Sequence, residues 1–98
     1  MFAETFTFDR NLARQLPLTL HAIDRCIERR IRAEHVNFVF FHGDLSFPTH
    51  AGRRTCEMSH RAAMQLRRQG IGPMNIGLLT SLTLIVSKSD SIVTAYRH

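Results

Sequence analysis

The clearest periodic pattern of hydrophobic and polar residues begins after Thr19. Apolar residues recur there at steps of three and four positions: Leu20, Ile23, Ile27 and Ile31. At 100° per residue these positions fall within a sector of about 80°, which is typical of an amphipathic helix with a narrow core-facing stripe. Thr19 is a suitable N-cap because its hydroxyl can accept a hydrogen bond from a backbone N–H of the first turn.

The same predicted helix carries a basic flank beside its apolar stripe. Four residues fall on this flank: His21, Arg25, Arg29 and Arg32. Cys26 and Arg30 fall outside both groups. Such a flank is most simply a solvated helix surface, but it also has the composition of a phosphate-binding surface.

A second helix is expected over residues 33–41. Glu34 is favourable in its first turn because a negative charge complements the helix dipole, and Gly43 is suited to end it. A strand over residues 37–41 is the alternative, because β-branched and aromatic residues are concentrated there.

The remaining helical signals are a third helix and a less regular lead-in. Ser59 can cap a helix over residues 59–69, which Gly70 would close. Residues 1–17 predict either a short edge strand or a helix around residues 11–16.

The last third of the chain carries the clearest β pattern. Residues 79–87 are rich in Leu, Ile, Val and Thr, and residues 91–96 follow with the same character. Ser89 and Asp90 lie between the two runs, as a hairpin turn requires. A further strand is expected over residues 53–58.

These elements predict a single α+β domain over residues 1–98. Helices come first and strands follow with one inserted helix, so the N-terminal helices are expected to pack on one face of a small antiparallel sheet. Residues 1–17 form the lead-in and residues 18–98 the core. A chain of 98 residues is close to the usual size of one domain.

Charge adds an expectation about partners. The chain has 13 Lys and Arg against 8 Asp and Glu, for a formal net charge of +5, and Lys88 is its only lysine. Arginine pairs two-pronged with phosphate and stacks on bases, so a surface for RNA, DNA or an acidic protein is expected. An arginine preference inherited from a GC-rich genome is the alternative explanation.

Cysteine usage and hydropathy bear on the cellular setting. Cys26 and Cys56 lack a Cys or His partner at zinc-finger spacing and are expected to be small core residues. No run approaches the roughly 20 apolar residues of a membrane span, and the N-terminus lacks the apolar run of a signal peptide. A reduced cytoplasmic location without membrane association is therefore expected.

Several kinds of catalytic site find no support in the sequence. The six histidines include no His-Glu-x-x-His pattern, and no second well-spaced pair accompanies His35 and His42. Ser59 and His60 are adjacent, but no Gly-x-Ser-x-Gly elbow is present, and Pro73 interrupts the only glycine-rich stretch. No metal site and no cofactor are therefore expected.

The basic flank is the better candidate for chemistry. Histidine exchanges protons near neutral pH, and RNA can be cleaved by attack of its own 2′-hydroxyl on the adjacent phosphate. An imidazole at His21 would move the proton, while guanidinium groups beside it would hold the phosphate and stabilise its extra negative charge.

Three groups of residues carry a family resemblance. They are the helix opening His21-Ala22 with Arg25 and Arg29-Arg30-Ile31, the central Gly52-Arg53-Arg54 with Ser59-His60-Arg61, and the ending Thr94-Ala95-Tyr96. With these motifs, residues 18–98 resemble a widespread bacterial family of small domains of unknown function that is grouped with the RelE/ParE-type toxins. Arg30 stands where that family usually has Gly.

The resemblance implies a RelE-like or barnase-like fold with a site between the first helix and the sheet. The catalytic positions that it implies are His21, Arg25, Arg54 and Thr94. Nucleic-acid contacts are expected from Arg29, Arg32, Arg53, Tyr96 and Arg97. Since Arg53 and Arg54 are consecutive, only one of them can face the site from a strand.

The expected function is that of a toxin-type ribonuclease, or a degenerate relative of one, which cleaves RNA without a metal. Its partners would be RNA and an acidic antitoxin. The first alternative is a non-catalytic module whose arginine face docks on nucleic acid or an acidic protein. The second is a structural domain that forms a homodimer through an edge strand. Catalysis requires His21, whereas pure binding depends on the arginines and on salt.

Overall fold

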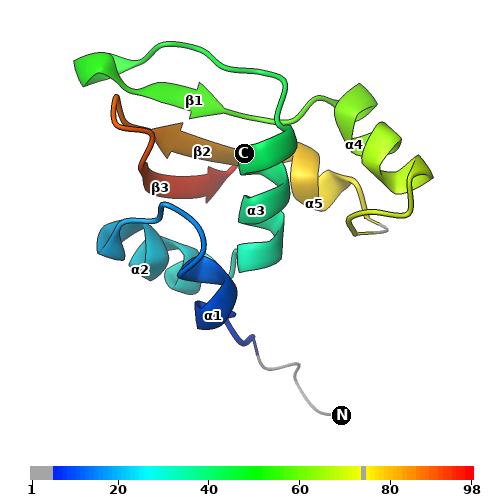
Figure 1. Ribbon diagram of the computed structural model, residues 1–98, viewed down its shortest axis with the longest axis horizontal. Coiled ribbons are helices and arrows are strands. Elements are labelled where there is room, and N and C mark those ends of the chain that lie inside the picture. Colours follow the sequence, from blue (N-terminus) through cyan, green and yellow to red (C-terminus); the bar gives the residue numbers. More distant parts are fainter. Residues whose placement is uncertain (1–5, 74) are drawn as a thin grey trace.

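A three-stranded antiparallel sheet is the centre of the fold (Figure 1). The computed structural model describes residues 6–73 and 75–98. Within them, the strands β1 (Arg54–Cys56), β2 (Leu82–Val86) and β3 (Ile92–Arg97) lie in the order β1-β2-β3. As the two β-rich runs predict, β2 and β3 form a hairpin, and Asp90 in its turn has a φ of 63°.

Helices lie in front of this sheet and at both ends of the molecule (Figure 1). In chain order the helical segments are α1 (Arg10–Ala13), α2 (Leu20–Glu28), α3 (Ala33–His42), η1 (His50–Gly52), α4 (His60–Arg68) and α5 (Gly77–Thr80). α3 crosses in front of the sheet, α2 packs beside β3, and α4 lies at the opposite end. The α+β class is thereby confirmed, with α4 inserted between β1 and β2.

The most deeply buried strand is β2. Leu82, Leu84 and Val86 are fully buried, and Val36 and Val39 of α3 belong to the same core. Burial of aliphatic side chains of this size stabilises the fold by roughly 1.5–3 kcal/mol each. This core fixes the hairpin, and with it the strand against which α2 packs.

The core-facing stripe expected for α2 is partly wrong. Leu20 is 80% exposed, whereas Ala22 and Cys26 are fully buried, although Cys26 was expected outside the stripe. Ile23 and Ile27 are only half-buried at the flanks. Small side chains at the contact let the helix approach β3 closely. The helical wheel missed the contact made by Ala22 and Cys26, because it ranks positions by hydrophobicity and not by side-chain size.

The C-terminus of α2 is closed by two backbone hydrogen bonds. The N–H of Ile31 donates to the Cys26 carbonyl at 2.8 Å, and the N–H of Arg30 donates to the Ile27 carbonyl at 3.3 Å. This is the Schellman arrangement, which requires a left-handed residue just beyond the helix. Arg30 has that conformation, with a φ of 53°. Glycine adopts it more readily, which gives a physical reason for glycine at the matching position of the resembled family.

Other expectations for single elements have definite outcomes. α3 is a helix throughout, so the alternative strand over residues 37–41 is wrong. Ser59 caps α4 as predicted, because its Oγ accepts a hydrogen bond of 3.1 Å from Ala62 N. Leu79 lies in α5 and not in the expected strand, which begins only at β2. In the lead-in, α1 is a helix, and the expectation for residues 1–5 lies outside the described residues.

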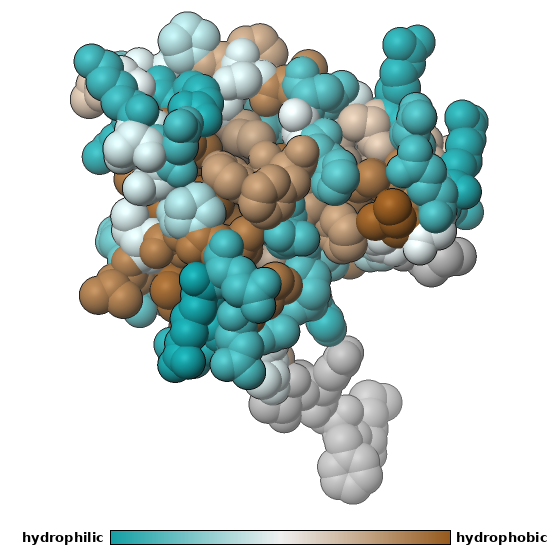
Figure 2. Space-filling view, viewed as in Figure 1, coloured by the Kyte–Doolittle hydropathy of each residue, from teal (hydrophilic) through white to brown (hydrophobic). Residues whose placement is uncertain are grey.

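Apolar side chains gather in the middle of one face, where α3 lies, between more hydrophilic surroundings (Figure 2). Phe38 and Phe40 of this helix are only partly buried, and Phe41 is 61% exposed. Among residues 6–73 and 75–98, no helix has the length and apolar character that a membrane crossing requires.

Candidate nucleic-acid site

A cavity of about 480 Å³ opens between α2 and the beginning of β3. Its walls bring together seven residues: Thr19, His21, Arg25, Arg29, Arg53, Val93 and Thr94. We call this cavity the basic cleft. It contains three of the four residues to which the resemblance assigns catalysis, and two of the five expected to contact nucleic acid.

The geometry of α2 explains why one helix supplies so much of the cleft. His21, Arg25 and Arg29 are four residues apart, so they lie above one another on a single helix face. Thr19 fixes the beginning of the helix, since its Oγ1 accepts a hydrogen bond of 3.1 Å from Ala22 N. The N–H of Thr19 also donates to the Ile92 carbonyl at 3.0 Å, which ties the helix start to β3.

An irregularity in the pairing of β2 with β3 brings two consecutive residues to the cleft. Ile85 pairs with Thr94 but Val86 pairs with Ile92, so Val93 is an extra residue in β3. In a regular strand, consecutive side chains point to opposite faces. A β-bulge relaxes this alternation and re-aims the side chains. Val93 and Thr94 therefore line the same cleft.

Three guanidinium groups give the cleft its charge, and each is held differently. Arg25 Nη1 lies 2.6 Å from Glu28 Oε2 in an ion pair. Arg29 Nη1 donates a hydrogen bond of 2.7 Å to the Ala95 carbonyl oxygen. Arg53 is exposed, and no hydrogen bond or ion pair engages its side chain within the described residues. An incoming phosphate would thus meet Arg25 in an ion pair, Arg29 held by a backbone carbonyl, and Arg53 with no partner among the described residues.

The structure places Arg54 away from the cleft, contrary to the expectation that it binds phosphate there. Its Nη2 lies 2.7 Å from Asp90 Oδ1, and its Nη1 donates a 3.4 Å hydrogen bond to the Ser87 carbonyl. Arg54 is the first residue of β1, whereas Arg53 precedes the strand. Because neighbouring strand positions point to opposite sides, Arg53 is the member of the pair that lines the cleft.

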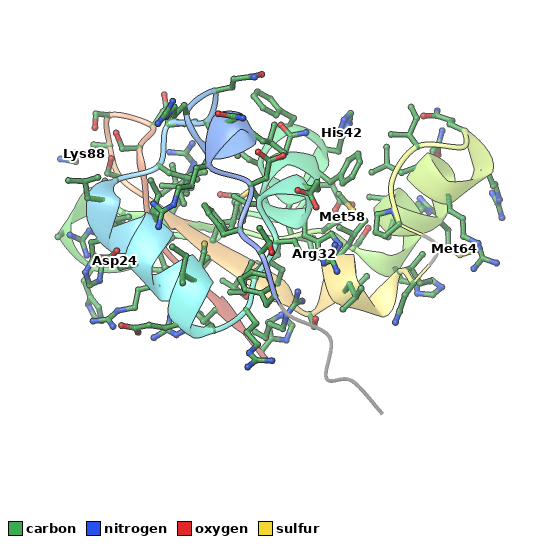
Figure 3. The ribbon with its side chains drawn as sticks, turned by 90° about the horizontal axis from the view of Figure 1, so that it is seen from below. Asp24, Arg32, His42, Met58, Met64 and Lys88 are labelled. Carbon is green, nitrogen blue, oxygen red and sulfur yellow. The ribbon has the colours of Figure 1, made fainter. Side chains whose placement is uncertain are left out.

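Three further residues expected to contact nucleic acid do not line the cleft: Arg32, Tyr96 and Arg97. Arg32 lines a different cavity, beside α3 and α5 (Figure 3). Arg97 Nη1 donates hydrogen bonds to the Leu78 carbonyl at 2.8 Å and to Ser81 Oγ at 3.1 Å, and burial lowers the pKa of its guanidinium. Tyr96 is 38% exposed on the sheet, two residues beyond Thr94.

The thiol beside the cleft is not poised as a nucleophile. Cys26 is fully buried, and this burial raises the pKa of its thiol to about 11, although the nearby Arg29 partly opposes the shift. At neutral pH the thiol is therefore protonated and unreactive. Nowhere in residues 6–73 and 75–98 do three His, Cys, Asp or Glu side chains gather closely enough to hold a metal ion.

Two residues of the cleft were not identified from the sequence as site residues. Thr19 was assigned only a capping role, and the same backbone position that caps α2 also puts it at the rim. Val93 was read as an ordinary strand residue. No local signal marks a bulge in this sequence, because the extra residue is defined by its pairing with β2.

The chain was compared with protein-family models, with curated proteins and with solved structures, and none of them matches it.

Proposed function

We propose that this protein is a toxin-type endoribonuclease of the RelE-like kind, which binds RNA at the basic cleft and cleaves it without a metal in the cytoplasm. The observation that carries the proposal is the convergence of one imidazole, three guanidinium groups and two threonine hydroxyls on a single cavity. Proton transfer and phosphate stabilisation are the two tasks that RNA cleavage sets, and these side chains can perform both.

The reaction is a transesterification within the RNA chain. His21 takes the proton from a ribose 2′-hydroxyl, and the 2′-oxygen forms a bond to phosphorus. The bond between phosphorus and the 5′-oxygen of the next nucleotide breaks. Water supplies the proton to that leaving oxygen, and His21 returns its proton to solvent. The products are a 2′,3′-cyclic phosphate and a 5′-hydroxyl end.

The arginines and the threonine act on the phosphate. Arg29 is oriented by its hydrogen bond to the Ala95 carbonyl, so it offers a preorganised donor for the charge that develops on the phosphoryl oxygens. Arg53 supplies an open guanidinium, and Thr94 supplies a hydroxyl that can position the scissile group. Arg25 joins them when the phosphate displaces Glu28.

A second candidate function is a non-catalytic module that docks RNA or an acidic protein such as an antitoxin. It is favoured by the single imidazole in the cleft: among the described lining residues, His21 has no second acid–base group to protonate the leaving oxygen. The ion pair of Arg25 with Glu28 also supports this function, because a carboxylate of a partner could take the place of Glu28 at this guanidinium.

One experiment separates the two functions. Purified protein is incubated with end-labelled RNA in the presence of a chelator, and the new ends are analysed for 2′,3′-cyclic phosphate. Catalysis predicts cleavage that His21→Ala abolishes while RNA affinity stays within about twofold, because the arginines carry most of the binding. His60→Ala, at an exposed position on α4, is the matched control and should cleave like the wild type.

The outcome is decisive in both directions. Absence of cleavage by the wild type, combined with RNA binding that is lost on removal of the arginines, would establish the binding module in place of the enzyme. Cleavage that persists in His21→Ala would remove the proposed role of the imidazole.

A further inference from the structure

A second cavity, of about 540 Å³, lies between the first half of α3 and the segment around α5. We call it the His35 cavity. None of the residues that line it also lines the basic cleft. Its size falls in the range of cavities that hold small organic ligands.

A nearly buried imidazole with an unsatisfied nitrogen forms part of the cavity wall. His35 lines it and is only 6% exposed. Its Nδ1 is buried and has no hydrogen-bond partner among the described residues. An unpaired buried polar atom costs roughly 1–3 kcal/mol, so such atoms are rare in folded proteins and call for an explanation. A ligand would satisfy this nitrogen by turning the ring toward the cavity, since the atom presents no accessible surface in this structure.

The imidazole is neutral under ordinary conditions. Burial lowers the pKa of His35 to about 4, and the positive charges of Arg97 and Arg32 contribute to the shift. A neutral ring offers one donor and one acceptor nitrogen, which suits the edge of a heterocycle better than it suits a phosphate.

The other walls supply complementary chemistry. Phe38 and Leu78 provide apolar surface for a flat ring. Asn75 Oδ1 already accepts a hydrogen bond of 3.0 Å from Gly77 N, which orients the carboxamide and leaves its N–H groups for a ligand acceptor. The cavity therefore combines apolar surface for a ring with two polar groups for its edge.

Two charged side chains of the cavity indicate which substituents a bound ring should have. Glu34 lines the cavity and can accept hydrogen bonds from a pair of hydroxyls, and Arg32 lines it as a cation for an anionic group. A simple aromatic acid would leave Glu34 without a donor. A heterocyclic base joined to a sugar and a phosphate would match the apolar surface, the polar groups at the ring edge, the carboxylate of Glu34 and the cation of Arg32.

From this combination we propose that the His35 cavity binds a nucleoside monophosphate unit. The base lies against Phe38 with its edge bonded by His35 and Asn75, the ribose hydroxyls meet Glu34, and the phosphate meets Arg32. The unit is either a free nucleotide or one nucleotide of an RNA strand. This site goes beyond the proposed cleavage reaction and does not depend on it.

The test is an NMR titration of the isotope-labelled full chain with AMP, GMP, CMP and UMP into the millimolar range. At least one nucleotide should give saturable shifts at the backbone amides of residues 32–38 and 75–78 and at the His35 ring. Asn75→Ala and His35→Gln should each weaken this binding about tenfold or more, which corresponds to about 1.4 kcal/mol. His21→Ala, in the basic cleft, is the control and should leave the affinity unchanged.

Each further outcome decides between named alternatives. Ribose 5-phosphate, which lacks the base, should bind at least tenfold more weakly. A six-nucleotide RNA that produces the same shifts more tightly than any free nucleotide identifies a strand as the source, and the reverse order identifies a free nucleotide. Saturable shifts confined to residues of the basic cleft, or none with any of the four nucleotides, overturn the proposal. Asn75 is exposed, so its variant remains interpretable if His35→Gln does not fold.

Discussion

Arg53 and Arg54 are neighbours in sequence, yet only Arg53 lines the basic cleft. Arg54 instead holds the hairpin turn through Asp90 and the Ser87 carbonyl. The family resemblance selects Arg54 for phosphate binding, and the strand geometry selects its neighbour. Since the two side chains have the same chemistry, the difference lies only in which side of the sheet each one reaches.

Paired substitutions of these arginines should therefore separate binding from stability. Arg53→Gln should weaken RNA binding about tenfold, because it removes a charge-assisted contact to phosphate, and should leave the melting temperature unchanged. Arg54→Gln should lower the free energy of unfolding by less than about 1 kcal/mol, since its ion pair is largely exposed, and should leave RNA affinity unchanged. Fluorescence anisotropy with labelled RNA and chemical denaturation measure the two quantities. If Arg54→Gln weakened RNA binding and Arg53→Gln did not, Arg54 would be the phosphate-binding residue after all.

His35 gives a pH dependence with a defined sign. Its pKa is about 4 in the folded protein against an ordinary value of 6.5. Between these two pH values, the His35 imidazole therefore takes up a proton only when the chain is unfolded. Stability is therefore fully present above pH 6.5 and falls as the pH drops to about 4. Each unit of pKa difference is worth about 1.4 kcal/mol, so the loss reaches about 3 kcal/mol.

Thermal unfolding between pH 7 and pH 4 tests this dependence. His35→Gln removes the titrating group, so the variant should lose distinctly less stability than the wild type over this range. His42→Ala changes an exposed histidine of the same helix and should retain the wild-type slope. Parallel curves for wild type and His35→Gln would show that the imidazole is not buried in its neutral form.

From residue spacing alone, the candidate site was predictable only where a helix carries it. His21 and Arg25 follow from the four-residue spacing on α2, and Thr94 came from the resemblance. Val93 could not be predicted, because a bulge depends on the register between two strands that are distant from α2 in sequence. The unpaired nitrogen of His35 also depends on tertiary burial, and no pattern around that residue indicates it.

At the scale of elements, prediction succeeded where a cap marks the boundary. Thr19 and Ser59 each accept the hydrogen bond that begins a helix, and α2 and α4 start where these residues predict. α5 was missed because its two leucines continue an apolar run that resembles a strand, and packing decides between the two. The end of α2 was placed too late, because Arg30 gives no sign of the left-handed conformation that stops the helix.

That helix end gives a prediction of increased stability. A left-handed conformation costs a residue with a Cβ roughly 1 kcal/mol relative to glycine, so Arg30→Gly should raise the free energy of unfolding by about that amount. Arg30→Ala removes the same side chain but keeps the Cβ, and it should not be stabilising. RNA affinity should stay the same in both, since Arg30 does not line the basic cleft. Equal stabilities of the two variants in chemical denaturation would contradict the strain argument.

At the scale of the whole molecule, positive charge is divided between two ends. The helices α2 and α4 lie at opposite ends of the molecule (Figures 1 and 3). The basic cleft is beside α2, and α4 carries another arginine group. That group consists of Arg61, Arg67 and Arg68, which are all exposed. The net charge of +5 alone does not tell which end meets RNA. The basic cleft gathers three arginines around His21, whereas the cavity beside α4 joins only Arg61 to His42, so the proposed RNA site is the cleft.

The salt dependence of RNA binding counts the phosphates that are contacted. Each phosphate neutralised on a single strand contributes a slope of about −0.7 to the logarithm of affinity against the logarithm of salt concentration. With three arginines in the cleft, the proposed site predicts a slope of about −2. Arg53→Gln should reduce its magnitude by about 0.7, whereas the double variant Arg67→Gln and Arg68→Gln should not change it. A wild-type slope near −4 that falls in the double variant would instead show that RNA spans both ends of the molecule.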